Sequence, residues 1–130
     1  MENIEKIFKV FNDKTSGYHI KTNKQVIKLL MGDIQHNFEK FGYFLSEDES
    51  DFDKFVGAEI IEIKTVDKVI KEDVLLASET NMLKDFDKYE FAFIDVRTSE
   101  GTLQFATYNC GSYGHQVRVE SEQLNFEKWI

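Results

Sequence analysis

Two neighbouring stretches in the last third of the chain constrain the fold most strongly. Residues 91–97 and 102–108 are rich in aromatic and β-branched side chains, which favour extended strands. Between them lies Thr98-Ser99-Glu100-Gly101, and glycine can adopt the positive φ that such a turn requires. The pattern predicts an antiparallel β-hairpin, so the fold must contain an antiparallel sheet.

Other segments also have the composition of strands: residues 17–22, 25–30, 58–64 and 115–120. The first two flank Asn23-Lys24, which predicts a second hairpin. The last alternates with period two and places Val117 and Val119 on one face. Together with the first hairpin, these segments predict a sheet of about five to six strands.

Helical signals occur near the start and the middle of the chain. Apolar side chains recur at helical spacing at Ile4, Ile7, Phe8 and Phe11. Ser50 can cap a second helix, whose apolar face would hold Phe52, Phe55 and Val56, and Gly57 can end it. Residues 67–88 show the least clear secondary-structure pattern. Residues 74–77 are a candidate buried segment, and residues 80–86 are a candidate third helix.

Size and composition favour one domain over residues 1–130. The chain is 42% apolar and contains twelve Phe, enough for a hydrophobic core, and it has no Gly/Ser-rich linker or internal repeat. We therefore expect an α+β fold with two or three short helices on the antiparallel sheet. No apolar run reaches the roughly 18 residues of a spanning helix, and the start lacks a signal-peptide pattern. The expected location is the cytoplasm, of the host cell if the gene is phage-encoded.

The charge is strongly and unevenly negative. The formal net charge is −8, with +2 over residues 1–46 and −10 over residues 47–130. Such a surface repels phosphate backbones and anionic lipids, so we expect no direct contact with nucleic acid or a membrane. The same charge suits a basic protein partner, and it also serves solubility alone.

The densest acidic segment is a candidate partner-binding site, made of Glu47, Asp48, Glu49, Asp51 and Asp53. Its spacing does not fit an EF-hand, which needs a glycine at the sixth position. A helix N-terminus explains Asp51 and Asp53. The remaining acids form either a solvated loop or a contact for a basic partner.

A glycine-containing connection after the best hairpin is a candidate ligand loop, made of Tyr108, Asn109, Cys110, Tyr113 and His115. His115 could activate the single cysteine across a tight turn, but nothing else supports a catalytic triad. The simpler interpretation is a connection between two strands whose aromatic side chains pack against the rest of the protein. The histidines His19, His36 and His115 lack metal-ligand spacing, so we expect no metal and no cofactor.

Three stretches resemble a family of small uncharacterised proteins found mainly in phages and mobile elements of low-GC bacteria: residues 24–43, residues 55–60, and residues 101–110 with Tyr113-Gly114-His115. They cover about two thirds of the chain and contain no catalytic signature. The family often has two adjacent cysteines where this chain has Asn37-Phe38, which removes a thiol or metal role there. The resemblance implies a phage context, in which small proteins often disable host machinery.

Three functions follow from these observations. The first is a non-enzymatic, anti-CRISPR-like inhibitor that binds a basic host defence protein, such as a CRISPR effector nuclease, through the acidic segment. The alternative is a small-molecule or nucleotide-sequestering protein, which would need several basic side chains to converge: Lys21, Lys28, Arg97 and Arg118. An enzyme built on Cys110 and His115 is the third. The sequence defines neither the partner nor the oligomeric state.

Overall fold

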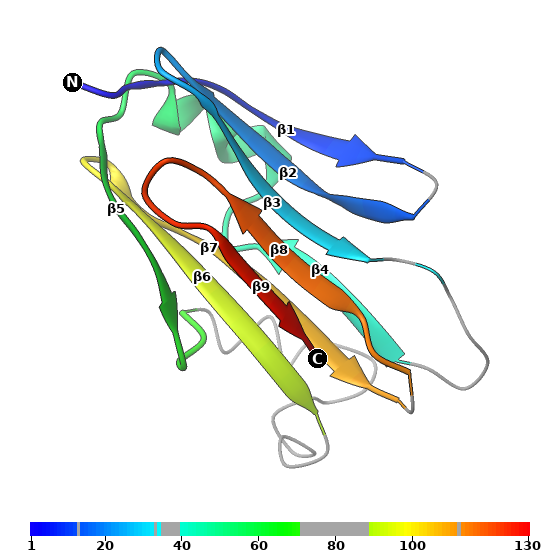
Figure 1. Cartoon of the computed structure of the whole chain (residues 1–130). Coiled ribbons are helices and arrows are strands. Elements are labelled where there is room, and N and C mark those ends of the chain that lie inside the picture. The colour runs from blue at the N-terminus through cyan, green and yellow to red at the C-terminus, as the bar shows by residue number, and fades with distance from the viewer. Residues whose placement is uncertain (13, 33, 35–39, 71–88, 112) are drawn as a thin grey trace.

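The protein is a sandwich of two antiparallel β-sheets (Figure 1). The computed structural model describes residues 1–12, 14–32, 34, 40–70, 89–111 and 113–130. Among these described residues, strands make up 63% and helical residues 7%, so the fold is mostly β. The elements are β1 (Ile4–Phe11), β2 (Thr15–Thr22), β3 (Val26–Gly32), β4 (Lys40–Leu45), η1 (Glu49–Phe55), β5 (Ile60–Val66), β6 (Glu90–Thr98), β7 (Gly101–Cys110), β8 (Gln116–Glu120) and β9 (Phe126–Trp129).

The two sheets draw on different parts of the chain. The five-stranded sheet has the order β1-β2-β3-β8-β9, and the four-stranded sheet has the order β4-β7-β6-β5. The first sheet therefore joins both ends of the chain, while the middle of the chain builds the second. Figure 1 shows the N and C termini at opposite ends of the sandwich.

The expected α+β class is wrong, and the first segment shows why. Residues 4–11 form strand β1, paired with β2. A register shift between Ile4 and Lys6 places a β-bulge in the strand. Because a bulge adds one residue, Ile4 and Ile7 both face the core although they are three positions apart. The bulge thus imitates helical spacing.

The helix expected near residue 50 is present in a different form. Glu49–Phe55 is a 3-10 helix preceded by Asp48 at the cap position, so Ser50 lies inside it. Phe52 and Phe55 are buried as expected, whereas Val56 is exposed. The expectations for residues 74–77 and 80–86 lie outside the described residues. In the described part of the chain, no helix is long and apolar enough to cross a membrane.

The individual strands and hairpins are confirmed, but the expected single sheet of about five to six strands is wrong, because the strands divide between a five-stranded and a four-stranded sheet. β2 pairs with β3, β6 pairs with β7, and Gly101 has a φ of 123° in the predicted turn. β5 covers most of the predicted strand at residues 58–64, and β8 covers that at residues 115–120. Val117 and Val119 are both buried on the inner face.

The core lies between the sheets. Fully buried side chains from both inner faces meet there: Ile20, Ile27 and Leu29 from the five-stranded sheet, and Ile94, Leu103 and Phe105 from the four-stranded sheet. The Tyr18 ring makes edge contacts with Phe52 and Phe105, with centroids 6.1 Å apart in each case. Through Phe52, the 3-10 helix is anchored to the same core, where each buried aromatic side chain contributes about 1.5–3 kcal/mol.

The outer face of the four-stranded sheet is also apolar. It carries a second group of side chains, here named the outer-face cluster: Phe44, Val69, Tyr89, Phe91, Tyr108 and Cys110. Gln104, fully buried on this face, donates from Nε2 to the Lys68 carbonyl at 2.9 Å and accepts from the Ile70 N–H at 2.8 Å. The chain after β5 therefore returns across this face.

Candidate ligand-binding site

One end of the sandwich brings five residues together in a layer that we name the sandwich mouth. Phe41, Asn109 and Glu90 are register partners across β4, β7 and β6. Strand parity places all three on the inner face of the four-stranded sheet. The facing sheet contributes His115 and Ile130, which extend the β8–β9 ladder through two backbone hydrogen bonds of 2.9 and 3.0 Å.

Asn109 is the central polar side chain of the mouth. It is 4% exposed, and its Nδ2 donates to the carbonyls of Tyr113 at 2.8 Å and Ile130 at 2.9 Å. These two bonds determine which way the amide faces, because only the nitrogen can donate. Its Oδ1 is buried and has no donor, and among the described residues no other buried side-chain polar atom lacks a partner. Leaving a buried acceptor unpaired costs about 1–3 kcal/mol.

His115 supports the mouth from the opposite sheet. Its Nδ1 lies 2.9 Å from the Gly32 carbonyl oxygen. A carbonyl can only accept, so this nitrogen carries the proton. The imidazole also stacks on the Phe41 ring, with centroids 3.8 Å apart and planes 18° apart. These contacts fix the position of the His115 ring.

A hollow of about 270 Å³ opens at the mouth and is named the mouth hollow. Its lining consists of Glu90, Asn109, Gly111, Tyr113, Gly114, Trp129 and Ile130. The aromatic side chains Tyr113 and Trp129 are 52% and 65% exposed, and Glu90 is exposed. A Cβ on Gly114 would lie 3.2 Å from the Trp129 ring, so the glycine lets the indole lie against the chain. No basic residue is among the described lining.

Two other hollows differ from this one. One of about 400 Å³ shares Gly114 and Trp129 with the mouth hollow and also borders Lys14. The larger, of about 610 Å³, lies between β9 and the end of β5, beside Phe93 and Phe126. The described lining of both hollows contains no buried polar side-chain atom without a partner. Asn109, the residue that carries the unpaired acceptor, lines the mouth hollow and is not in the described lining of either of these two.

The expected ligand loop is divided between two faces. Asn109 and Tyr113 line the mouth hollow, and His115 lies in the mouth. Tyr108 and Cys110 instead belong to the outer-face cluster, where burial and then the neighbouring Tyr89 raise the pKa of Tyr108. The Cys110 side chain therefore lies outside the four-stranded sheet, whereas His115 lies on its inner side. The two residues do not form a cysteine–histidine pair.

Sequence reasoning missed Glu90 and Trp129. A signal for Glu90 was present, because the predicted turn pairs Thr98 with Gly101 and the same register continues to Glu90 and Asn109. Trp129 gave no such signal, since β9 reaches the mouth only through its pairing with β8.

The acidic segment is exposed, as a partner-binding site requires. Glu49 and Asp53 on η1 are exposed, as is Asp48 just before it, while Glu47 and Asp51 are half-buried. The Asp51 carboxylate lies 3.0 Å from Lys54 Nζ and raises the pKa of that lysine through a hydrogen bond and its charge.

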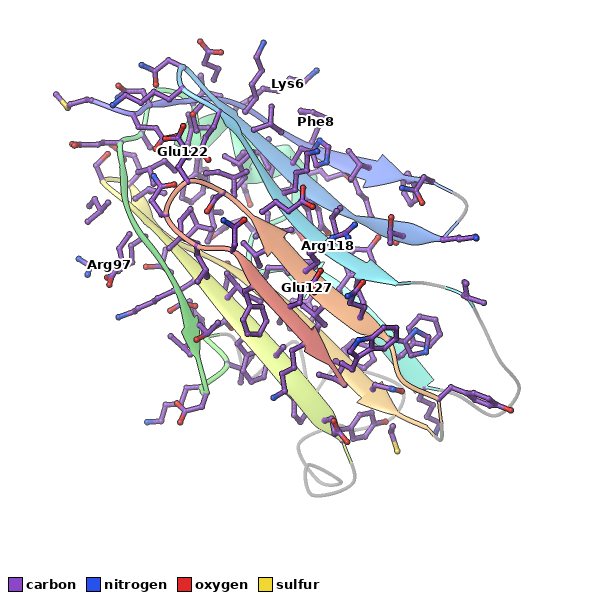
Figure 2. The ribbon with its side chains drawn as sticks, viewed as in Figure 1. Lys6, Phe8, Arg97, Arg118, Glu122 and Glu127 are labelled. Carbon is purple, nitrogen blue, oxygen red and sulfur yellow. The ribbon has the colours of Figure 1, made fainter. Side chains whose placement is uncertain are left out.

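The acids near the C-terminus do not extend this segment. Glu120 lies on the outer face of the five-stranded sheet, 3.6 Å from Lys28 and 3.4 Å from Arg118. Arg118 and Glu127 are register partners, and Figure 2 shows them over β8 and β9, with Glu122 at the connecting turn. Because positive side chains alternate with these acids, the outer face is mixed in charge.

Of the basic residues that a nucleotide site would need, Lys28 and Arg118 both contact Glu120, and the other two lie beside different glutamates. Lys21 is 3.9 Å from Glu5, and Arg97 is 3.1 Å from Glu62. Lys21, like Lys28 and Arg118, belongs to the five-stranded sheet, whereas Arg97 belongs to the other sheet. None lines the mouth hollow. This arrangement disfavours a phosphate-binding site there.

A second group of polar side chains lies at the far end of the sandwich and is named the Glu2 cluster: the buried Glu2 and Thr22 with the half-buried Gln25 and the exposed Gln123. Glu2 is 7% exposed, and one carboxylate oxygen accepts from Thr22 at 2.6 Å and Gln25 at 2.7 Å. The other accepts from Gln123 at 2.6 Å. Burial alone would raise the pKa of Glu2, but these hydrogen bonds and the charge of Lys24 lower it below its ordinary value.

Metal binding finds no support among the described residues, where no group of three or more His, Cys, Asp or Glu side chains could hold an ion. His36 lies outside the described residues. Comparison with models of protein families, with curated proteins and with solved structures found no match.

Proposed function

We propose that this protein is a non-catalytic binding protein that holds a small ligand in the mouth hollow. The observation that carries the proposal is the unpaired Oδ1 of Asn109, a buried acceptor on a residue that lines an open hollow. Exposed aromatic rings at Tyr113 and Trp129 supply contact area around it. Ligand sites typically combine such apolar surfaces with a few placed polar groups.

The size of the hollow limits the ligand. At about 270 Å³ it lies just below the common range of drug-sized pockets, so it suits a small molecule or one side chain of a larger partner. Of the two binding functions considered from the sequence, the geometry favours the alternative, a small-molecule binder, but without a phosphate site.

The single tryptophan provides a direct test, because all tryptophan fluorescence comes from Trp129. A panel of cationic, neutral and anionic small molecules should contain at least one that changes this fluorescence and raises the melting temperature. The Trp129→Ala variant should lose the thermal shift. Val56→Ala, another exposed apolar side chain, should keep it. Absence of any response from the panel at about 10 mM would contradict the proposal.

Inhibition of a basic host defence protein is a second candidate. The observation in its favour is the display of carboxylates on η1, which the buried Phe52 and Phe55 hold against the core. A pull-down with basic defence nucleases should retain the protein at about 50 mM salt and release it at about 500 mM.

A charge-neutralised acidic segment separates this candidate from general electrostatics. The triple variant Glu47→Gln, Asp48→Asn, Glu49→Gln should lose the partner. A triple variant on the five-stranded sheet, Glu5→Gln, Glu120→Gln, Glu127→Gln, makes the same change in net charge and should retain it. Equal loss in both variants would mean that only overall charge matters.

A further inference from the structure

We propose that the mouth hollow recognises a cationic nitrogen group with N–H donors, a primary ammonium or a guanidinium, carried by a free amine or by a Lys or Arg side chain of another protein. This inference rests on the proposed function, because it names the ligand class of the same site. Three properties of the lining lead to it: the buried acceptor, the charge and the exposed rings.

The buried acceptor demands a donor. Asn109 Nδ2 already donates to two carbonyls, so its amide cannot rotate to present the nitrogen without losing both bonds. The group that satisfies Oδ1 must therefore carry N–H or O–H. A phosphate or carboxylate oxygen would face Oδ1 acceptor to acceptor, which is unfavourable.

The charge of the lining selects among donors. Glu90 is the register partner of Asn109 on the adjacent strand, so the two side chains project from the same face. The described lining holds no basic residue, and the whole chain carries −8. A positive ligand gains from Glu90, whereas an anion is repelled.

The exposed rings add to the same preference. Tyr113 and Trp129 line the hollow and are each more than half exposed. Tyrosine and tryptophan attract cations over their faces by about 0.5–1 kcal/mol at exposed sites and about 2 kcal/mol when water is excluded. A guanidinium can stack on such a ring while its N–H groups reach an acceptor.

Binding must include a local rearrangement, because Oδ1 is buried before the ligand arrives. A small shift of Asn109 or of the side chains over it would expose this oxygen. The NMR signals of the Asn109 side-chain amide and of the Trp129 indole should therefore both shift on binding. Contact with the exposed rings alone would shift only the indole signal.

The experiment titrates the full chain at constant ionic strength and follows Trp129 fluorescence and the Asn109 amide. Methylguanidinium and methylammonium are the test probes, with dissociation constants on the order of 1 mM or weaker for such small ligands. Tetramethylammonium carries the charge without N–H, and urea carries N–H without the charge. Both should bind at least about tenfold more weakly than methylguanidinium, a difference of about 1.4 kcal/mol.

Variants and a peptide arm complete the test. Glu90→Gln should weaken methylguanidinium binding at least threefold, while Glu127→Gln, an exposed acid on β9, should leave it unchanged. A peptide whose only charged group is one central Arg, with blocked termini, would identify a protein side chain as the source if it binds more tightly than methylguanidinium. The reverse order would identify a free amine.

The outcomes separate this inference from the proposed function. Equal binding of tetramethylammonium and methylguanidinium, or no effect of Glu90→Gln, would overturn the inference. A neutral or anionic ligand that moves Trp129 and Asn109 while the amines do not would overturn it and leave the proposed function intact. No response from either reporter to any small molecule would overturn both.

Discussion

The two ends of the sandwich differ in whether the polar atoms of their buried side chains all have hydrogen-bond partners. In the Glu2 cluster, both carboxylate oxygens of Glu2 accept hydrogen bonds from Thr22, Gln25 and Gln123. At the mouth, Asn109 retains an oxygen without a donor beside exposed aromatic rings. A fully satisfied network closes and orders a structure, whereas an unsatisfied group beside a hollow is costly unless a ligand completes it. The contrast indicates a structural role for the Glu2 end and agrees with the binding role that we propose for the mouth.

The largest expected effect comes from Asn109→Asp. The carboxylate would place an acceptor where Nδ2 now donates to the Tyr113 and Ile130 carbonyls. We expect a loss of about 3 kcal/mol or more in the free energy of unfolding at neutral pH, because a buried charge would face two acceptors. Asn109→Ala should lose only about 1–2 kcal/mol, since it also removes the unpaired oxygen. Equal losses, measured by urea unfolding, would mean that Oδ1 has a partner in solution.

The next largest effect is expected at the satisfied end, from Glu2→Ala. This change removes three hydrogen bonds to a carboxylate, although Thr22 and Gln25 keep second acceptors in the Gln25 carbonyl and the Gln123 side chain. We therefore expect a loss of about 2 kcal/mol in urea unfolding. Glu2→Gln retains one acceptor oxygen and should lose less. If the alanine variant lost less than about 0.5 kcal/mol in the free energy of unfolding, the Glu2 cluster would not stabilise the fold. The proposed contrast with the mouth would then be wrong.

Acid titration gives a smaller effect at the same end. Because the folded pKa of Glu2 lies below its ordinary value of 4.5, its contribution to stability is complete above that pH. The contribution falls as the pH drops from there through the folded value. Wild-type protein should therefore lose stability more steeply below about pH 4.5 than Glu2→Gln does in thermal unfolding.

His19 provides the control for that titration. Its pKa is lowered by burial and then by the nearby Lys28, so its own contribution to stability falls as the pH drops below 6.5. This loss occurs in both proteins and at higher pH. If the stability of the wild-type protein and that of Glu2→Gln fell in parallel below pH 4.5, the hydrogen bonds of Glu2 would not favour its ionised form.

The smallest effect on stability should come from Trp129→Ala. The side chain is 65% exposed, so its removal should change the free energy of unfolding by no more than about 0.5 kcal/mol. Ligand binding at the mouth should nevertheless be lost, as calorimetry would detect. A large loss of stability would instead make the indole part of the structure and would remove the contrast between the two ends.

Local patterns predicted some elements well and misled at others. The β6–β7 hairpin followed from two arms rich in aromatic and β-branched residues and a glycine turn, both of which depend only on neighbouring residues. The bulge in β1 imitated a helix, because one inserted residue changes the spacing of inward side chains. β4 was not predicted, because apolar side chains point to both of its faces and no alternation of apolar and polar residues results. Phe41 and Tyr43 face the core, and Phe44 faces the outer-face cluster.

The candidate site was predictable only in its β7 half. The sequence alone determined the β6–β7 hairpin and, through its register, the pairing of Asn109 with Glu90. Only the tertiary structure decided that β8 and β9 join the N-terminal strands and carry Ile130 and Trp129 to Asn109. The physical reason is that turns and alternation act over a few residues, whereas the pairing of distant strands depends on burial summed over both faces of the sandwich.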